Sequence, residues 1–111
     1  MPIRILIPTD FSKNAFNAIE YAMALFQDKT CEFYFLHTYF LPGYARENFF
    51  SPKPSNEDFE KRKKRAEDRM ERFKNRMKTY EKNERHTCHY LNEFGSFYDT
   101  MQQKAENNNI D

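Results

Sequence analysis

The polar residues with the clearest chemical potential in this 111-residue chain follow a short apolar run near its beginning. Thr9 and Asp10 come directly after residues 3–7, a run that Pro8 closes. In open α/β sheets, ligands sit beyond the carboxyl ends of the strands, where the strand order reverses. A carboxylate at that place can hydrogen-bond a ribose or a base or bind a divalent ion, but it can equally cap the following helix. Position alone leaves both roles of Asp10 open.

His37 and Thr38 lie near the end of a second apolar run, residues 31–39, which would form the other wall of that crevice. A single histidine in a strand is more often a satisfied core residue than a ligand or a base. We therefore expect His37 to belong to the core.

The cluster of His86, Cys88 and His89 suggests zinc, because imidazole and thiolate are zinc ligands. Side chains alternate along a strand, which sends His86 and Cys88 to one face and His89 to the other. At most two of the three can converge, so we expect no metal.

Glycines are scarce, and Gly43 and Gly95 are the only two. A backbone cradle for phosphates needs closely spaced glycines at a helix start, so that N–H groups can approach the oxygens. The sequence also contains no nucleophile elbow, no Walker-type lysine and no paired carboxylate cluster of a catalytic kind. We expect neither a phosphate cradle nor an enzyme.

Six elements would position these residues, because short runs rich in apolar and aromatic side chains alternate with stretches in which apolar residues recur every three or four positions. Residues 41–56, with Pro42, Pro52 and Pro54, are predicted to be a loop, and residues 92–95 the exit loop of the third strand. The predicted strands are residues 3–7, 31–39 and 86–91, and the predicted helices are residues 12–26, 56–82 and 97–107.

This order predicts a three-layer α/β/α domain. Right-handed crossovers make the three strands parallel, in the order 3-2-1, with helices on both faces. The arrangement is part of a doubly wound fold.

The long helix is highly charged, with eleven basic and seven acidic residues between positions 57 and 82. The simplest interpretation is a solvated face with ion pairs; the alternative is a patch that contacts an acidic partner or RNA. Phe59 and Phe73 fall on the apolar stripe of this helix, so they are not free to stack on bases.

Composition bounds the remaining possibilities. The net charge of +1 gives no global field to attract nucleic acid or an anionic membrane. Cys31 and Cys88 are too few for a disulfide framework, and we interpret them as buried free thiols. The apolar run at the start is too short for a signal or membrane-spanning segment, so we expect a cytoplasmic protein.

Two stretches resemble the universal stress protein family. Residues 5–12 read Ile-Leu-Ile-Pro-Thr-Asp-Phe-Ser, and residues 35–39 read Phe-Leu-His-Thr-Tyr. In that family the first strand ends in a similar Pro-Thr-Asp-Phe-Ser run and the second in a Leu-His-Val-like run. Gly95 and residues 105–111 are similar to the family's third helix leading into its fourth strand. The resemblance spans the chain, which corresponds to the first three strand-helix units of a family domain.

The resemblance implies a five-stranded parallel sheet of the adenine nucleotide alpha hydrolase-like type that binds ATP, often dimerises, and acts in stress tolerance or signalling. It implies that Pro8, Thr9 and Asp10 border the adenosine. Thr38 stands where the family makes a backbone contact to adenine. The family's phosphate-binding glycine motif follows its fourth strand. We therefore expect residues 1–111 to be a single domain that stops before strands 4 and 5, with ATP as a possible ligand but with impaired phosphate binding.

Because strand 1 would lie at an edge, we expect self-association into a homo-oligomer, a dimer, through that edge or the apolar helix faces. A different hypothesis is a structural or protein-interaction domain that binds no nucleotide and uses the long basic helix. A third is a phosphoryl-accepting, receiver-like domain, which needs clustered acids for magnesium. Asp10 stands alone and the third strand is followed by Asn92 and Glu93, which argues against the third hypothesis.

Overall fold

The computed structural model describes residues 2–39 and 56–111. Strands and helices alternate as the sequence predicts, and the predicted loop at residues 41–56 lies almost wholly outside the described residues. The elements are β1 (Ile3–Pro8), α1 (Lys13–Leu25), β2 (Cys31–Tyr39), α2 (Asn56–Met77), the 3-10 turn η1 (Tyr80–Lys82), β3 (His86–Phe94) and α3 (Phe97–Asn107).

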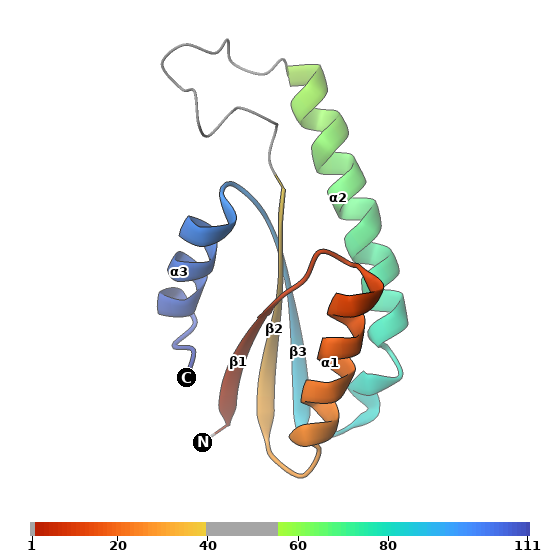
Figure 1. Ribbon diagram of the computed structural model, residues 1–111, viewed down its shortest axis with the longest axis vertical. Coiled ribbons are helices and arrows are strands. Elements are labelled where there is room, and N and C mark those ends of the chain that lie inside the picture. Colours follow the sequence, from red (N-terminus) through yellow and green to blue (C-terminus); the bar gives the residue numbers. More distant parts are fainter. Residues whose placement is uncertain (1, 40–55) are drawn as a thin grey trace.

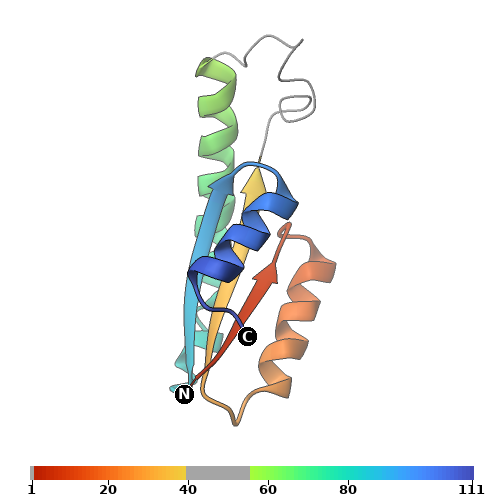
Figure 2. The same ribbon diagram turned by 90° about the vertical axis from the view of Figure 1, so that its left-hand side faces the viewer.

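The three strands form one parallel sheet in the order β1-β2-β3, which confirms the predicted topology. In the register, Cys31 at the start of β2 lies opposite Ile3 of β1 and His86 of β3. Helices α1 and α2 cover one face of the sheet and α3 covers the other (Figure 1). Figure 2 looks onto the face that α3 covers. The predicted three-layer α/β/α architecture is therefore confirmed for the described residues.

The main core lies between β2 and the helix pair α1 and α2. Alternate side chains of β2 point to this face and are buried against apolar side chains at helical spacing on both helices. The central members are Cys31, Phe33 and Phe35 of β2, Phe16, Ile19 and Met23 of α1, and Met70, Phe73 and Met77 of α2.

Both cysteines are free, as expected. Cys31 is buried, as predicted, but Cys88 is only half-buried, so the prediction of a buried thiol is wrong there. Burial still raises the pKa of both thiols, that of Cys88 to about 11. Their thiols are therefore protonated at neutral pH and weakly nucleophilic.

The predicted helix at residues 56–82 is too long. Helix α2 ends at Met77, and Tyr80 lies in η1 instead. The Tyr80 ring turns towards α1, where it lies 6.1 Å from the Phe16 ring and its hydroxyl donates to Glu20. Apolar spacing continues from Met77 to Tyr80, so periodicity does not show where the α-helix stops.

The predicted exit loop at residues 92–95 is also wrong, because β3 continues to Phe94. Asn92 and Glu93 pair in register with His37 and Thr38 of β2. Their polar side chains have partners: Asn92 Oδ1 lies 2.9 Å from His37 Nδ1, and Glu93 Oε1 lies 2.8 Å from Lys104 Nζ on α3.

Side-chain caps define the helix ends that the sequence suggested. Ser12 Oγ accepts from Ala15 N at 3.1 Å and begins α1, and Ser96 Oγ accepts from Asp99 N at 3.3 Å and begins α3. After α3, Asn109 has a φ of 53°, the left-handed conformation predicted for an asparagine in the run that ends this helix.

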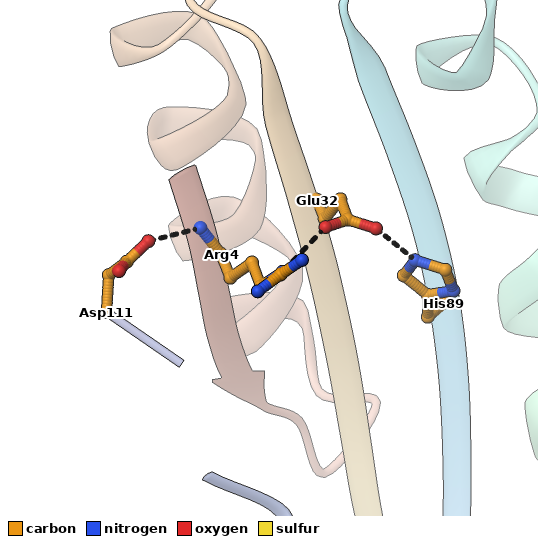
Figure 3. A network of polar contacts seen from close by, with 4 residues as sticks. All are labelled: Arg4, Glu32, His89 and Asp111. Atoms are coloured by element: carbon orange, nitrogen blue, oxygen red, sulfur yellow. Dashed lines mark hydrogen bonds and ion pairs between the residues drawn. The ribbon is translucent and has the colours of Figure 1, made fainter. Parts of the chain in front are cut away.

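A polar network crosses the sheet on the α3 face (Figure 3). Arg4 Nε donates to Glu32 Oε2 at 2.8 Å, and Glu32 Oε1 lies 3.3 Å from His89 Nε2. The hydrogen bond from Arg4 lowers the pKa of Glu32. One residue from each strand therefore meets on this face. Arg4 interrupts the apolar run of β1 because its side chain points to Glu32.

The outer edge of β1 is partly occupied. Asp111 N donates to Arg4 O at 3.1 Å, and Arg4 N donates to Asp111 Oδ2 at 2.8 Å (Figure 3). The two termini consequently lie close together beside β1 (Figures 1 and 2). The expected row of unpaired backbone groups along this edge strand is thus interrupted at Arg4.

Candidate functional site

A crevice of about 500 Å³ lies at the carboxyl ends of β1 and β2, between them and the start of α1. This is the place where open α/β sheets bind ligands. The structure brings together there all four site residues proposed from the sequence. The residues that line the crevice are Pro8, Thr9, Asp10, Ser12, Asn14, Ala15, Leu36, His37 and Thr38.

The turn between β1 and α1 is held by side chains that bond to its own backbone. Thr9 Oγ1 accepts from Phe11 N at 3.0 Å, and Asp10 Oδ1 accepts from Ser12 N at 2.9 Å. Thr9 N also donates to Leu36 O at 2.8 Å, which fixes this turn to β2. Phe11 has a φ of 64°, a conformation that costs energy for a residue with a large side chain.

The helix cap is Ser12, not Asp10, so the structure separates the two roles that position alone left open. Asp10 is exposed, and hydrogen bonds from Ser12 lower the pKa of its carboxyl group. Asp10 therefore offers an ionised carboxylate with remaining acceptor capacity to the crevice, held in place by its hydrogen bonds from Ser12.

His37 is a buried wall of the crevice, as the core interpretation predicted. Its Nδ1 bonds Asn92 Oδ1, and its ring lies 4.4 Å from the Phe11 ring at an interplanar angle of 37°. Burial lowers the pKa of His37, and the charge of Arg69 acts in the same direction. His37 is therefore neutral at pH 7.

The histidines and cysteine of β3 do not form a metal site. His86 Nε2 lies 2.9 Å from Phe26 O, whereas His89 on the opposite face contacts Glu32. Residues 2–39 and 56–111 contain no group of three or more histidines, cysteines or acids that could hold a metal ion. No helix within the same two ranges is long and apolar enough to cross a membrane.

Comparison with models of protein families shows to which family this chain belongs. The model of the universal stress protein family matches residues 1–111. The chain belongs to the universal stress protein family. Some members of this family bind ATP, many form homodimers, and its members are generally not catalysts.

Solved structures share the fold of this universal stress protein chain. Hypothetical protein MJ0577 is 24% identical with a TM-score of 0.73, and the alignment covers 100% of this chain and 71% of that one. Universal stress protein UspA from Lactobacillus plantarum is 17% identical with a TM-score of 0.68 over 98% of this chain and 72% of that one. Hypothetical protein PH0823 is 23% identical with a TM-score of 0.64 over 99% and 72%. No match was found among curated protein sequences.

Sequence reasoning missed several walls of the crevice. Ser12, Asn14 and Ala15 line it from the first turn of α1, and Phe11 supports it through the His37 ring. The signal for the turn was present, since Thr and Asp side chains commonly bond backbone groups two residues onward. Nothing in the sequence indicated the left-handed conformation of Phe11, because phenylalanine rarely adopts it.

Proposed function

We propose that this universal stress protein chain is a stress-response module that binds adenine nucleotides through their adenosine part. The observation that carries the proposal is the convergence of Pro8, Thr9 and Asp10 with Thr38 around one crevice of about 500 Å³. That volume is within the range of small-molecule sites, about 300–1,000 Å³. The ATP binding of some family members supports the same ligand class.

The proposed contacts follow from the groups that the crevice presents. Asp10 would accept hydrogen bonds from the ribose hydroxyls, because an ionised carboxylate has more acceptor positions than the hydrogen bonds from Ser12 fill. The backbone at Thr38, at the end of β2, would contact the adenine edge. Pro8 and Leu36 would supply apolar surface beside the base.

The phosphates would gain little from the backbone of residues 1–111. Gly43 and Gly95 are the only glycines in them, and a cradle of N–H groups needs closely spaced glycines at a helix start. We therefore propose that the base and the sugar provide most of the affinity for ATP. No nucleophile motif accompanies the crevice, so the proposed role is binding without turnover.

Isothermal titration calorimetry with adenosine and with ATP tests this proposal. We expect adenosine to bind with a stoichiometry of one, and ATP to bind within about tenfold of it, a difference of about 1.4 kcal/mol. Guanosine serves as the control for base recognition. Failure of adenosine to bind would favour the alternative function, a protein-interaction domain without nucleotide.

We also propose that the chain forms a homodimer in the cytoplasm. Two free thiols fit a reducing compartment. The edge of β1 and the exposed apolar side chains Tyr21 and Leu25 of α1 are the candidate contact surfaces. Sedimentation velocity should show a dimer whose population rises with concentration, and a monomer at all concentrations would refute it.

A further inference from the structure

Helix α2 carries a row of arginines along one flank of its apolar stripe. The spacing of three, four, three and four residues places them on one face, and all are exposed. The row extends over about 21 Å at 1.5 Å per residue. Its members are Arg62, Arg65, Arg69, Arg72 and Arg76.

The first three of these arginines line a hollow of about 330 Å³ at the end of β2. The opposite wall consists of His37, Thr38 and Tyr39. His37 and Thr38 also line the crevice that contains Asp10, so the two hollows are neighbours across the tip of β2. Helix α2 thus brings a concentrated positive charge beside the nucleoside crevice, in a hollow that Asp10 does not line.

Within residues 2–39 and 56–111, Arg62, Arg65 and Arg69 make no ion pair, although α2 has acids of its own. Burial raises the pKa of the Tyr39 hydroxyl, and the charges of Glu67 and Glu60 add to this effect. Neither of these two carboxylates forms an ion pair with Arg62, Arg65 or Arg69. The face is solvated, as expected, but these three arginines form no ion pair with the described residues.

The chemistry of the hollow favours phosphate. A guanidinium group is a planar fork of donors that matches phosphate oxygens in a bidentate way, which an ammonium group cannot do. The hollow is concave and has the size of a small-ligand site, which suits a short phosphate chain. An acidic helix of a partner protein would instead need a flat, extended surface. Single-stranded RNA would need several free aromatic rings for stacking of successive bases, but Phe73 beside Arg69 is buried in the core and Tyr39 is the only tyrosine or phenylalanine among the described residues that line the hollow.

We infer that Arg62, Arg65 and Arg69 form a binding site for a phosphate chain, of the kind found in inorganic polyphosphate or in the tail of a nucleotide. The site is distinct from the nucleoside crevice and does not depend on the function proposed for it. A free chain is the expected ligand, because the three arginines line a hollow of their own, which Asp10 does not line.

Calorimetry with sodium tripolyphosphate on the full chain at low salt tests the inference. The variant Arg62→Gln/Arg65→Gln/Arg69→Gln should bind tripolyphosphate at least tenfold more weakly than the wild type, with adenosine binding unchanged. The matched control Lys63→Gln/Lys64→Gln/Lys78→Gln removes the same charge from residues that do not line the hollow. The affinity of this control variant for tripolyphosphate should be less than threefold weaker than that of the wild type. Because all six side chains are exposed, both variants should keep the wild-type urea midpoint.

Two further titrations distinguish the sources of the phosphate chain. Tripolyphosphate that binds adenosine-saturated protein with undiminished affinity identifies a free chain. Weaker ATP binding in the arginine variant, with unchanged adenosine binding, identifies the nucleotide's own phosphates. If the wild-type protein binds tripolyphosphate but does not bind adenosine, the proposed function is refuted. The inference of a phosphate-chain site is then still supported.

Three results would overturn the inference. The first is an equal loss of tripolyphosphate binding in the arginine and lysine variants, which would show general charge attraction. The second is tighter binding of a polyglutamate peptide or of single-stranded RNA than of tripolyphosphate. The third is displacement of adenosine by tripolyphosphate in the arginine variant, which would place the anion in the nucleoside crevice.

Discussion

The substitution Asp10→Asn is expected to weaken adenosine binding by about tenfold to a hundredfold, because a hydrogen bond to a charged group contributes about 1.5–3 kcal/mol. Asn retains an oxygen that can accept from Ser12 N, the bond that Asp10 Oδ1 makes at 2.9 Å. It replaces the other carboxylate oxygen by an amide group that can only donate. The turn before α1 should therefore persist while the acceptor for the ribose is lost.

Asp28→Asn is the matched control for this experiment. Asp28 is exposed in the turn after α1, at the opposite end of the sheet, and its substitution makes the same change in net charge. We expect unchanged adenosine affinity in calorimetry. Equal affinity for adenosine in Asp10→Asn and wild-type protein would show that Asp10 does not hold the ribose.

The substitution Phe35→Ala is expected to lower the free energy of unfolding by about 3–5 kcal/mol, the range for truncating a buried phenylalanine. Phe35 lies at the centre of β2 and is 0% exposed. Its ring lies 5.5 Å from the Phe73 ring of α2 and 5.7 Å from the Tyr90 ring of β3. The cavity would therefore open between the sheet and the helix that carries the arginines.

Urea denaturation followed by circular dichroism measures this loss. Tyr98→Ala is the control, because Tyr98 is also aromatic but 74% exposed, and its removal should change the free energy by less than about 0.5 kcal/mol. A loss below about 1 kcal/mol for Phe35→Ala would mean that the core does not centre on β2.

The central strand and the first helix could be predicted from the sequence because independent signals coincide there. Residues 31–39 are dense in aromatic side chains and end at Tyr39, as β2 does. The spacing of Phe16, Ile19 and Met23 defined the buried face of α1. Local propensity and tertiary burial favour the same structure in both segments.

The ends of β3 and α2 could not be predicted because tertiary contacts decide them. Asn92 reads as a loop residue until it is seen beside His37. Tyr80 continues the apolar spacing of α2, yet it leaves the helix to bond Glu20 of α1. In each case a side-chain partner far away in the sequence overrides the local pattern.

The candidate site was predictable only in part. The run from Pro8 to Ser12 marked the turn, but the sequence did not show that Ser12 caps α1 and that the Asp10 carboxylate keeps acceptor capacity. The number of charges in the long helix does not by itself indicate that its arginines form a row on one face. The row becomes visible only when the residues are placed by helical spacing beside the end of β2.

The backbone amide shifts of the protein during an adenosine titration test the central claim most directly, namely that the tips of β1 and β2 bind the nucleoside. We predict saturable shifts in ¹H–¹⁵N spectra at Thr9, Asp10 and Thr38, with the amides of residues 86–89 at the far end of β3 unaffected. Saturable shifts that map elsewhere, or no shifts at millimolar adenosine, would contradict the account.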